Sequence, residues 1–395
     1  MNRPRIYMDY HATTPVDPRV FKAMEPYFSE LYGNPASKNH SFGREARDAV
    51  EKAREQIATL IGAKPREIIF TSGATESNNL ALKGVARVLG RTSASAKKHI
   101  VTVATEHRAV LDPCEVLARE GFEVTYLGVR ADGLIDLAEL AAAITDRTFL
   151  VSVMQANNEI GVIQKLEEIG AYCRDRGVVF HVDGAQAVGK IPVDVGAMGI
   201  DLLSISGHKL YAPKGIGALY VRSGQPRLTL QSQMDGGGHE QGLRSGTLPT
   251  PLIVALGVAC DICQTEMDAE ADTVGALRDQ LLHGILEAVD GVQVNGSLEQ
   301  RLPGNLNLCF GGIEAESLLQ KVPDIALSTG SACTTANLQP SHVLKALGLG
   351  HEAALSSVRF GLGRYTTGEE IELVISQVVE AVKELREKSL LSNFS

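Results

Sequence analysis

The sequence contains no tryptophan, and aromatic residues make up only 5% of its 395 residues. It also lacks any apolar run approaching the roughly 20 residues that a membrane-spanning helix needs, so we predict no membrane segment. The N-terminal stretch MNRPRIYMDYHATTP has no continuous apolar core of the kind found in secretory signal peptides. These absences predict a cytoplasmic protein.

The chain likewise lacks the basic excess of nucleic-acid-binding proteins, because 47 Asp and Glu outnumber 38 Lys and Arg and give a net charge of −9. We therefore predict no nucleic-acid partner. Cysteines are few and scattered, at Cys114, Cys173, Cys260, Cys263, Cys309 and Cys333. This spacing is not a disulfide framework, and thiols stay reduced in the cytosol. The pair C-x-x-C at 260–263 lies in a helical pattern without a second pair, so we predict two helix cysteines and no metal site.

Short β-branched segments alternate with amphipathic ones between residues 60 and 222. The predicted strands are REIIFTS, HIVTVATE, FEVTYLG, TFLVSVM, VVFHVDG, DLLSIS and IGALYV. Alternation of strand and helix predicts an α/β fold with a mostly parallel, seven-stranded sheet covered by helices. We assign this large domain to residues 16–264.

A smaller α+β domain is predicted for residues 265–395, with residues 1–15 packing against it. A long helical pattern around residues 251–289 leads into it, and NLNLCF and SSVRFGLG read as strands. The last helix begins with a capping box between Thr367 and Glu370.

Polar side chains gather where the predicted strands of the large domain end. They are Ala74 and Thr75 at a strand-to-helix junction, His107, Asn158, Asp183, Gln186, Ser206, His208 and Lys209. In α/β sheets ligands bind at the carboxyl ends of the strands. A helix N-terminus binds phosphate, a lysine forms a Schiff base, and a carboxylate keeps a pyridine nitrogen protonated. Together these groups predict a pyridoxal phosphate site.

Each of these residues also has an ordinary structural interpretation: Asp183 as a cap and His208 as a surface residue. A competing motif, GAQAVGKI at 184–191, has the glycine and lysine spacing of a nucleotide P-loop. Ile191 stands where that motif needs Ser or Thr, and Pro192 disfavours helical geometry before it. The pyridoxal interpretation is therefore favoured.

The sequence resembles the cysteine desulfurases of iron–sulfur cluster assembly, which belong to the class-V aminotransferases of pyridoxal phosphate fold type I. The resemblance is carried by YMDYHATTPVDPRV, GNPAS, FTSGATESNN, TEHRAVLD, NNEIG, HVDGAQAVGK, SGHKLYAPKGIGALY, GGGHEQGLRSGTLP, STGSACTT and SSVRFGLGRYTT. It implies conversion of L-cysteine to L-alanine, with a persulfide left for transfer to an iron–sulfur scaffold or another acceptor protein.

The resemblance also implies roles for individual residues. Lys209 would hold the cofactor covalently, Asp183 its ring nitrogen and Gln186 its phenolic oxygen, while His107 would stack on the ring. Ala74, Thr75, Ser206 and His208 would bind the phosphate. Thr247 would reach the phosphate of a neighbouring subunit, which implies a homodimer. Asn158 and Arg359 would bind the substrate carboxylate, with Asn158 also near the cofactor. Cys333, in a loop of small polar residues, would accept the sulfur.

Three features depart from the family pattern. His11 replaces a small or amide residue, Thr329 stands where serine is usual, and the short C-terminus predicts weaker docking to a scaffold protein. Two alternatives stay open at this point: another enzyme of the same fold, such as an aminotransferase or selenocysteine lyase, and a non-catalytic assembly partner. The Cys333 loop argues against the first and intact Lys209 and Asp183 against the second.

Overall fold

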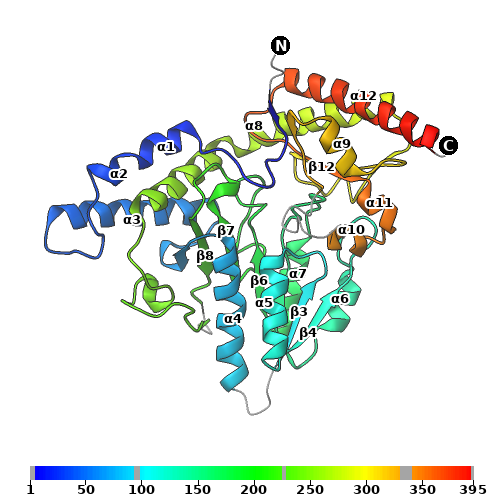
Figure 1. Ribbon diagram of the computed structural model, residues 1–395. Coiled ribbons are helices and arrows are strands. Elements are labelled where there is room, and N and C mark those ends of the chain that lie inside the picture. Colours follow the sequence, from blue (N-terminus) through cyan, green and yellow to red (C-terminus); the bar gives the residue numbers. More distant parts are fainter. Residues whose placement is uncertain (1–4, 93–97, 225–227, 330–339, 393–395) are drawn as a thin grey trace.

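A computed structural model describes residues 5–92, 98–224, 228–329 and 340–392 (Figure 1). Its largest sheet has seven strands in the order β2-β8-β7-β6-β5-β3-β4. In that order the strands are Ile68–Thr71, Gly217–Val221, Leu202–Ser206, Val179–Asp183, Thr148–Ser152, His99–Val103 and Glu123–Leu127. Only β8 runs against its neighbours in this sheet, so the sheet is mostly parallel. The predicted α/β fold and all seven predicted strands are confirmed.

Helices cover both faces of this sheet because side chains alternate along each strand. In β2, Ile69 packs with the cluster under α4 (Ala74–Thr92) and α5 (Arg108–Arg119). Its neighbours Ile68 and Phe70 point the other way. That opposite face is covered by α3 (Ser41–Leu60), α7 (Leu166–Arg176) and the first half of α8 (Thr250–Ala288). Further helices are α1 (Pro18–Met24), α2 (Pro26–Ser29) and α6 (Leu137–Ala143).

The second half of α8 packs in a separate apolar cluster, so this single helix of 39 residues joins two cores. The second core covers a three-stranded antiparallel sheet in the order β12-β10-β9, with strands Ser357–Gly361, Asn305–Phe310 and Val292–Val294. Around it lie α9 (Ala315–Lys321), α10 (His342–Ala346), α11 (His351–Leu355) and α12 (Gly368–Ser392). Figure 1 shows α12 beside α8.

The predicted capping box of the last helix is present. The Thr367 N–H donates to Glu370 Oε2 at 3.0 Å, and the Glu370 N–H donates to Thr367 Oγ1 at 3.2 Å. At the other end of the chain, β1 (Ile6–Tyr7) pairs in parallel with β11 (Ile325–Ala326). No helix in the described ranges has both the length and the apolar character to span a membrane.

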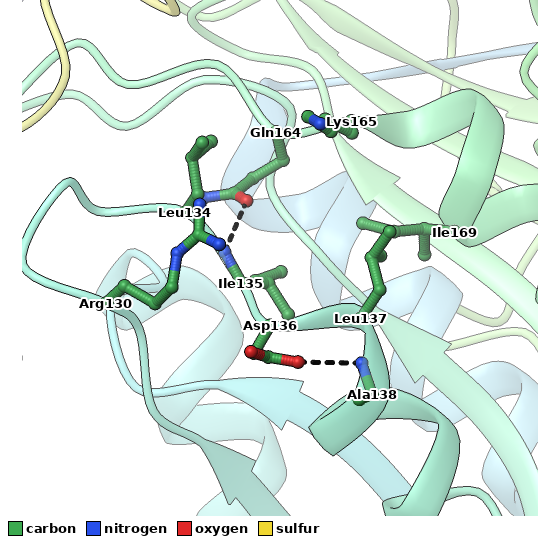
Figure 2. Close-up of a pocket in the computed structure, with 9 residues that line it drawn as sticks. All are labelled: Arg130, Leu134, Ile135, Asp136, Leu137, Ala138, Gln164, Lys165 and Ile169. Atoms are coloured by element: carbon green, nitrogen blue, oxygen red, sulfur yellow. Dashed lines mark hydrogen bonds between the residues drawn. The ribbon is translucent and has the colours of Figure 1, made fainter.

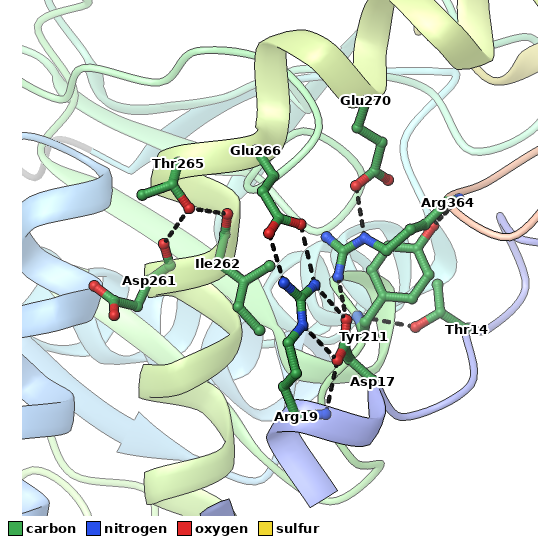
Figure 3. A network of polar contacts seen from close by, with 10 residues as sticks. All are labelled: Thr14, Asp17, Arg19, Tyr211, Asp261, Ile262, Thr265, Glu266, Glu270 and Arg364. Carbon is green, nitrogen blue, oxygen red and sulfur yellow. Dashed lines mark hydrogen bonds and ion pairs between the residues drawn. The ribbon is translucent and has the colours of Figure 1, made fainter.

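A network of ion pairs joins the start of α1 to α8 and to the loop after β12 (Figure 3). Asp17 is its centre, and its buried carboxylate accepts from Arg19 Nη2 at 2.8 Å and from Arg364 Nη1 at 2.7 Å. Arg364 also pairs with Glu270 of α8 at 2.8 Å. Hydrogen bonds from Arg19 hold the pKa of Asp17 well below its usual range. The network therefore links both cores through one buried charge.

We expect Asp17→Asn to lower the free energy of unfolding by about 3 kcal/mol, because it removes one of the two carboxylates that pair with the largely buried Arg364 guanidinium and also breaks the ion pair with Arg19. Asparagine keeps the oxygen that caps α1, so the change isolates the charge. Urea unfolding followed by circular dichroism measures the effect. The matched control is Asp112→Asn, whose exposed pair with Arg108 at 3.5 Å should contribute less than about 0.5 kcal/mol. Equal losses for both variants would contradict this role of Asp17.

Candidate active site

Asp183 stands at the carboxyl end of β6, in the middle of the sheet, and is only 4% exposed. Its Oδ2 accepts from Asn78 Nδ2 at 2.7 Å and its Oδ1 accepts from the Ala185 N–H at 2.9 Å. A carboxylate has about four acceptor positions, so these two bonds leave capacity for a further donor. Asn78 of α4, one helical turn after Ala74, was not predicted as a site residue. Its hydrogen bond to Asp183 shows that its side chain faces the sheet.

The junction between β2 and α4 forms a cradle at the same edge of the sheet. Gly73 has a φ of +150°, and a Cβ there would meet only Ser206 Oγ, at 4.0 Å. Ala74 and Thr75 then open α4, and the first N–H groups of a helix have no acceptors within it. Gly217 of β8 permits the close approach, since a Cβ on it would lie 2.6 Å from Gly73 Cα. Ser206 ends β7 next to this cradle.

Lys209 lies in a short 3₁₀ helix, Gly207–Lys209, directly after β7. Its Nζ donates to the His11 carbonyl at 2.5 Å and to the Ala12 carbonyl at 2.8 Å. His208 Nδ1 is 3.0 Å from Thr13 Oγ1. Burial, followed by the positive charge of Lys209, lowers the pKa of His208 to about 4. The segment around residues 11–13 therefore lies against both predicted ligands.

His107 caps α5, and its Nδ1 accepts from the Ala109 N–H at 3.0 Å. A backbone N–H can only donate, so the neutral ring carries its proton on Nε2. Burial lowers the pKa of His107. Behind it, Glu106 is fully buried and accepts from the Met154 N–H at 2.5 Å. Burial raises the pKa of Glu106 well above its usual range, and the charge of Asp183 raises it further.

Arg359 projects from β12 and contacts the backbone of Asn158, the other residue predicted to bind the substrate carboxylate. Its Nη1 donates to the Asn158 carbonyl at 2.8 Å and its Nη2 to Asp9 Oδ1 at 2.6 Å. The Arg359 side chain is 3% exposed, and within the described part of the chain its Nε has no hydrogen-bond partner. A buried guanidinium with an unused N–H has capacity for an anionic ligand.

The glycine-rich loop that carries Thr247 is anchored to the sheet edge. Glu240 forms a bidentate pair with Arg54, at 2.9 Å for both contacts, and accepts from the Phe70 N–H at 2.7 Å. Farther along the loop, Arg244 pairs with Glu76 in the first turn of α4 at 2.9 Å. Thr247 itself is exposed. None of these contacts joins it to another predicted phosphate ligand of the same chain.

Cys333 lies outside the described residues, within the segment 330–339. Both described flanks of that segment contact the site. Before it, the Arg359 N–H donates to the Ser328 carbonyl at 2.7 Å. After it, His342 Nε2 of α10 is 2.9 Å from the carbonyl of Glu106, the residue preceding His107.

The five described cysteines are all buried. Burial raises the pKa of Cys114 and Cys173 to about 12 and that of Cys263 to about 11. It also raises the thiol pKa of Cys260 and Cys309. Cys260 and Cys263 lie on α8, as predicted. Reactive thiols are exposed and have lowered pKa values, so none of these five fits a nucleophile.

A separate surface pocket lies beside α6 and contains none of the predicted site residues (Figure 2). Its polar groups hold one another: the Ile135 N–H donates to Gln164 Oε1 at 3.0 Å, and Asp136 caps α6 at the Ala138 N–H at 2.8 Å. Arg130 at its rim pairs with Asp132 at 2.8 Å. The polar groups of this pocket are thus accounted for by contacts within the fold. In the described ranges, no cluster of His, Cys, Asp and Glu could hold a metal ion.

The fold and site define the chain's class: residues 6–374 match the family described as Aminotransferase class-V, and the chain belongs to it. The "Cysteine desulfurase IscS" of Rickettsia conorii is 54% identical over 386 residues, covering 98% of this chain and 93% of that protein. Within the class-V family, the chain is therefore a member of the cysteine desulfurases.

Two solved structures are similar to this one. A "NIFS-LIKE PROTEIN" has a TM-score of 0.88 and 36% identity, covering 96% of this chain and 99% of that chain. A structure titled "SspA in complex with cysteine" has a TM-score of 0.81 and 39% identity, covering 92% of this chain and 100% of that chain.

His181 provides a pH test of the strand that positions Asp183. It bridges Ser152 Oγ at 2.8 Å and Ser204 Oγ at 3.1 Å, and burial lowers its pKa from 6.5 to about 3. The unfolded chain then binds a proton below pH 6.5 that the folded chain does not. We expect stability to fall as the pH drops through this window, by up to about 1.4 kcal/mol per pH unit from His181 alone.

Urea unfolding of wild type and His181→Asn between pH 4 and 6 tests this expectation. The wild-type slope of free energy against pH should be steeper than that of the variant. His351→Asn, which changes an exposed histidine, serves as the control and should keep the wild-type slope. Parallel slopes for wild type and His181→Asn would rule out the proposed proton linkage.

Proposed function

We propose that the chain is a pyridoxal phosphate-dependent cysteine desulfurase that converts L-cysteine to L-alanine and leaves a persulfide on Cys333. The observation that carries the proposal is the sheet edge, where a buried carboxylate, a lysine and a helix N-terminus converge in a member of the cysteine desulfurase family. The persulfide would pass to an iron–sulfur scaffold or another acceptor protein in the cytoplasm.

The residues present fit pyridoxal phosphate. The open space at Gly73 and the N-terminus of α4 suits a phosphate, which Ala74, Thr75, Ser206 and His208 would bind. Asp183 has acceptor capacity for a protonated ring nitrogen, and Gln186 would donate to the phenolic oxygen. Lys209 would hold the cofactor covalently, and the Nε2–H face of His107 would lie over the ring. When bound, the cofactor supplies an electron sink for a carbanion at the substrate Cα.

The chain's own residues would then divide the work. Arg359 and Asn158 would bind the substrate carboxylate, and the Lys209 amine would move the proton at Cα. The Cys333 thiolate would attack the substrate sulfur, so that an S–S bond forms while the Cβ–S bond breaks. The released carbon takes up a proton and leaves as alanine. Anchoring of both flanks of the Cys333 segment at Arg359 and Glu106 supports this role.

We propose further that the active form is a homodimer in which Thr247 completes the phosphate site of the partner. Exposed aromatic side chains on α1, α2, the loop after α2 and the start of α3 support an interface between copies, since water contact with such groups is unfavourable. They are Phe21, Phe28, Tyr32 and Phe42, each at least 47% exposed. The division into residues 1–15, 16–264 and 265–395 likewise stays a proposal, supported by the two cores that α8 joins.

The two roles of the enzyme should separate by mutation. Lys209→Ala should give colourless protein with no turnover. Cys333→Ser should remain yellow and change its absorption spectrum on addition of L-cysteine, yet produce neither alanine nor sulfide, because only the sulfur acceptor is missing. Alanine and sulfide are assayed together in the presence of a reductant. Cys309→Ala is the control and should retain turnover. Near-normal sulfide release from Cys333→Ser would refute the assignment.

The position of Thr247 can be tested by mixing subunits. Thr247→Val should weaken cofactor binding about tenfold through loss of a hydrogen bond to a charged group. Heterodimers of Thr247→Val and Lys209→Ala subunits should regain one site of full affinity, because the intact Lys209 then faces an intact Thr247 across the interface. Thr265→Val, an exposed threonine of α8, is the control. Two results would contradict action between subunits: heterodimers that regain no affinity, or a protein that is monomeric by light scattering and fully active.

A further inference from the structure

Lys190 is a lysine with no assigned role that lies at the edge of the site. It follows Gln186 by four residues in the turn after β6, where the Lys190 N–H donates to the Ala187 carbonyl at 2.9 Å. The same turn brings its Nζ to Gln186 Oε1, at 3.0 Å. The side chains of Gln186 and Lys190 are thus in direct contact on this turn.

The contact with Lys190 determines which end of the Gln186 carboxamide faces Lys190 and which end faces away from it. In its ammonium form Lys190 has only donors, so the group it meets is then the carboxamide oxygen. The Nε2 amide group is then on the other side, where it donates to the His11 carbonyl at 2.9 Å. Lys209 Nζ donates to that same carbonyl at 2.5 Å. The donor end of Gln186 therefore points to the place where Lys209 would hold the cofactor.

We infer that Lys190 is a positioning residue that keeps the Nε2 donor of Gln186 turned toward the cofactor's phenolic oxygen. This inference rests on the proposed pyridoxal phosphate function. A phenolate oxygen accepts hydrogen bonds, so it is stabilised by the Nε2 end of the carboxamide and repelled by the Oε1 end. Without Lys190, the carboxamide keeps only its contacts with His11 among the described residues, so the flipped orientation becomes more populated and the donor is lost for part of the time.

The surroundings of Lys190 add to the importance of its contact with Gln186. Lys190 lines a small cavity together with His11, Tyr211, Glu270 and Gly304 among others. Burial, then the charge of Lys209, lowers the pKa of Lys190 to about 7, while Glu270 opposes the shift; Arg359 and Cys263 also act on it electrostatically. In its ammonium form the partly buried side chain needs an acceptor, and Gln186 Oε1 is the one that the described structure gives it.

His11 also contacts Gln186 and is one of the departures from the family pattern. Its Nδ1 is 3.2 Å from Gln186 Oε1 and its Nε2 is 3.2 Å from the Gly304 carbonyl. Burial lowers the pKa of His11 well below its usual range, so the ring is neutral and carries one proton. With one proton, the ring can donate to only one of these two oxygens: from Nδ1 to the Gln186 carboxamide oxygen, or from Nε2 to the Gly304 carbonyl.

The test uses the visible absorption of the cofactor-loaded enzyme and its cofactor dissociation constant. Lys190→Met should raise the pH at which the visible band titrates, because a phenolate that has lost its donor attracts a proton more strongly. It should also weaken cofactor binding about fivefold, the worth of about one hydrogen bond. Lys190→Arg, which also offers only donors, should restore both values toward wild type. Lys383→Met removes an exposed lysine of α12 and should change neither.

A second pair of variants separates orientation from simple charge. If Lys190 acts through Gln186, then Lys190→Met should add no further shift in a Gln186→Ala background. A full additional shift there would overturn the inference, because it would mean that the charge of Lys190 acts on the cofactor directly. So would a Lys190→Met spectrum and dissociation constant equal to those of wild type.

Folding and the parent proposal are tested separately. Thermal unfolding of each variant without cofactor shows whether Lys190→Met merely destabilises the chain. If it does, Lys190→Gln is used in its place. The new side chain can offer either end of its own carboxamide to Gln186, so this variant should give the same spectral shift. A stable Lys190→Gln with wild-type values overturns the inference. A wild-type protein without a visible band overturns the proposed function, whereas a normal wild-type band with unshifted variants overturns only the role of Lys190.

Discussion

Residues Asp9 to Asp17 run between the seven-stranded and three-stranded sheets, and their hydrogen bonds go to both. Asp9 pairs with Arg359 of β12, and the His11 carbonyl accepts from Lys209 after β7. Thr14 accepts from the Tyr211 N–H, and Asp17 binds Arg364 beyond β12. Substrate and cofactor residues come from opposite sides of this segment. Its position therefore sets the spacing between them, and a shift at any one contact would be felt at the others.

The charges at the site are unevenly distributed, and this follows from which groups are buried. Lys209, Lys190 and Arg359 are cations close to one another, and their mutual influence contributes to the lowered pKa values of Lys190 and His11. The carboxylates of Asp183 and Asp9 balance only part of this charge, and each is already bound to a donor of its own. A surplus of positive charge is suited to ligands that carry phosphate and carboxylate groups.

Much of the fold could be read from local patterns, because each of the seven strands is a short β-branched run ending in turn residues. The strand-end rule likewise placed Asp183, Lys209 and His107 at one edge without any structure. Contacts between distant residues were beyond this reasoning: nothing near Arg359 in the sequence indicates Asp9, and Asn78 looks like an ordinary helix residue. The two-residue strand β1 is too short for any periodic pattern. Lys190 was visible only as part of a P-loop-like motif, and its contact with Gln186 could not be predicted from that pattern.

The pairing of β1 with β11 joins residues near the two ends of the chain, and Asp9 and Arg359 are 350 positions apart. During synthesis the N-terminal residues leave the ribosome first, yet their partners in β11 and β12 are among the last to be made. Contacts of such long sequence separation form late, because the chain between them must first be ordered. The sheet edge with Asp183 and Lys209 can assemble earlier. The substrate side of the site is therefore completed only when translation is nearly finished, and the nascent chain passes through a stage with half a site.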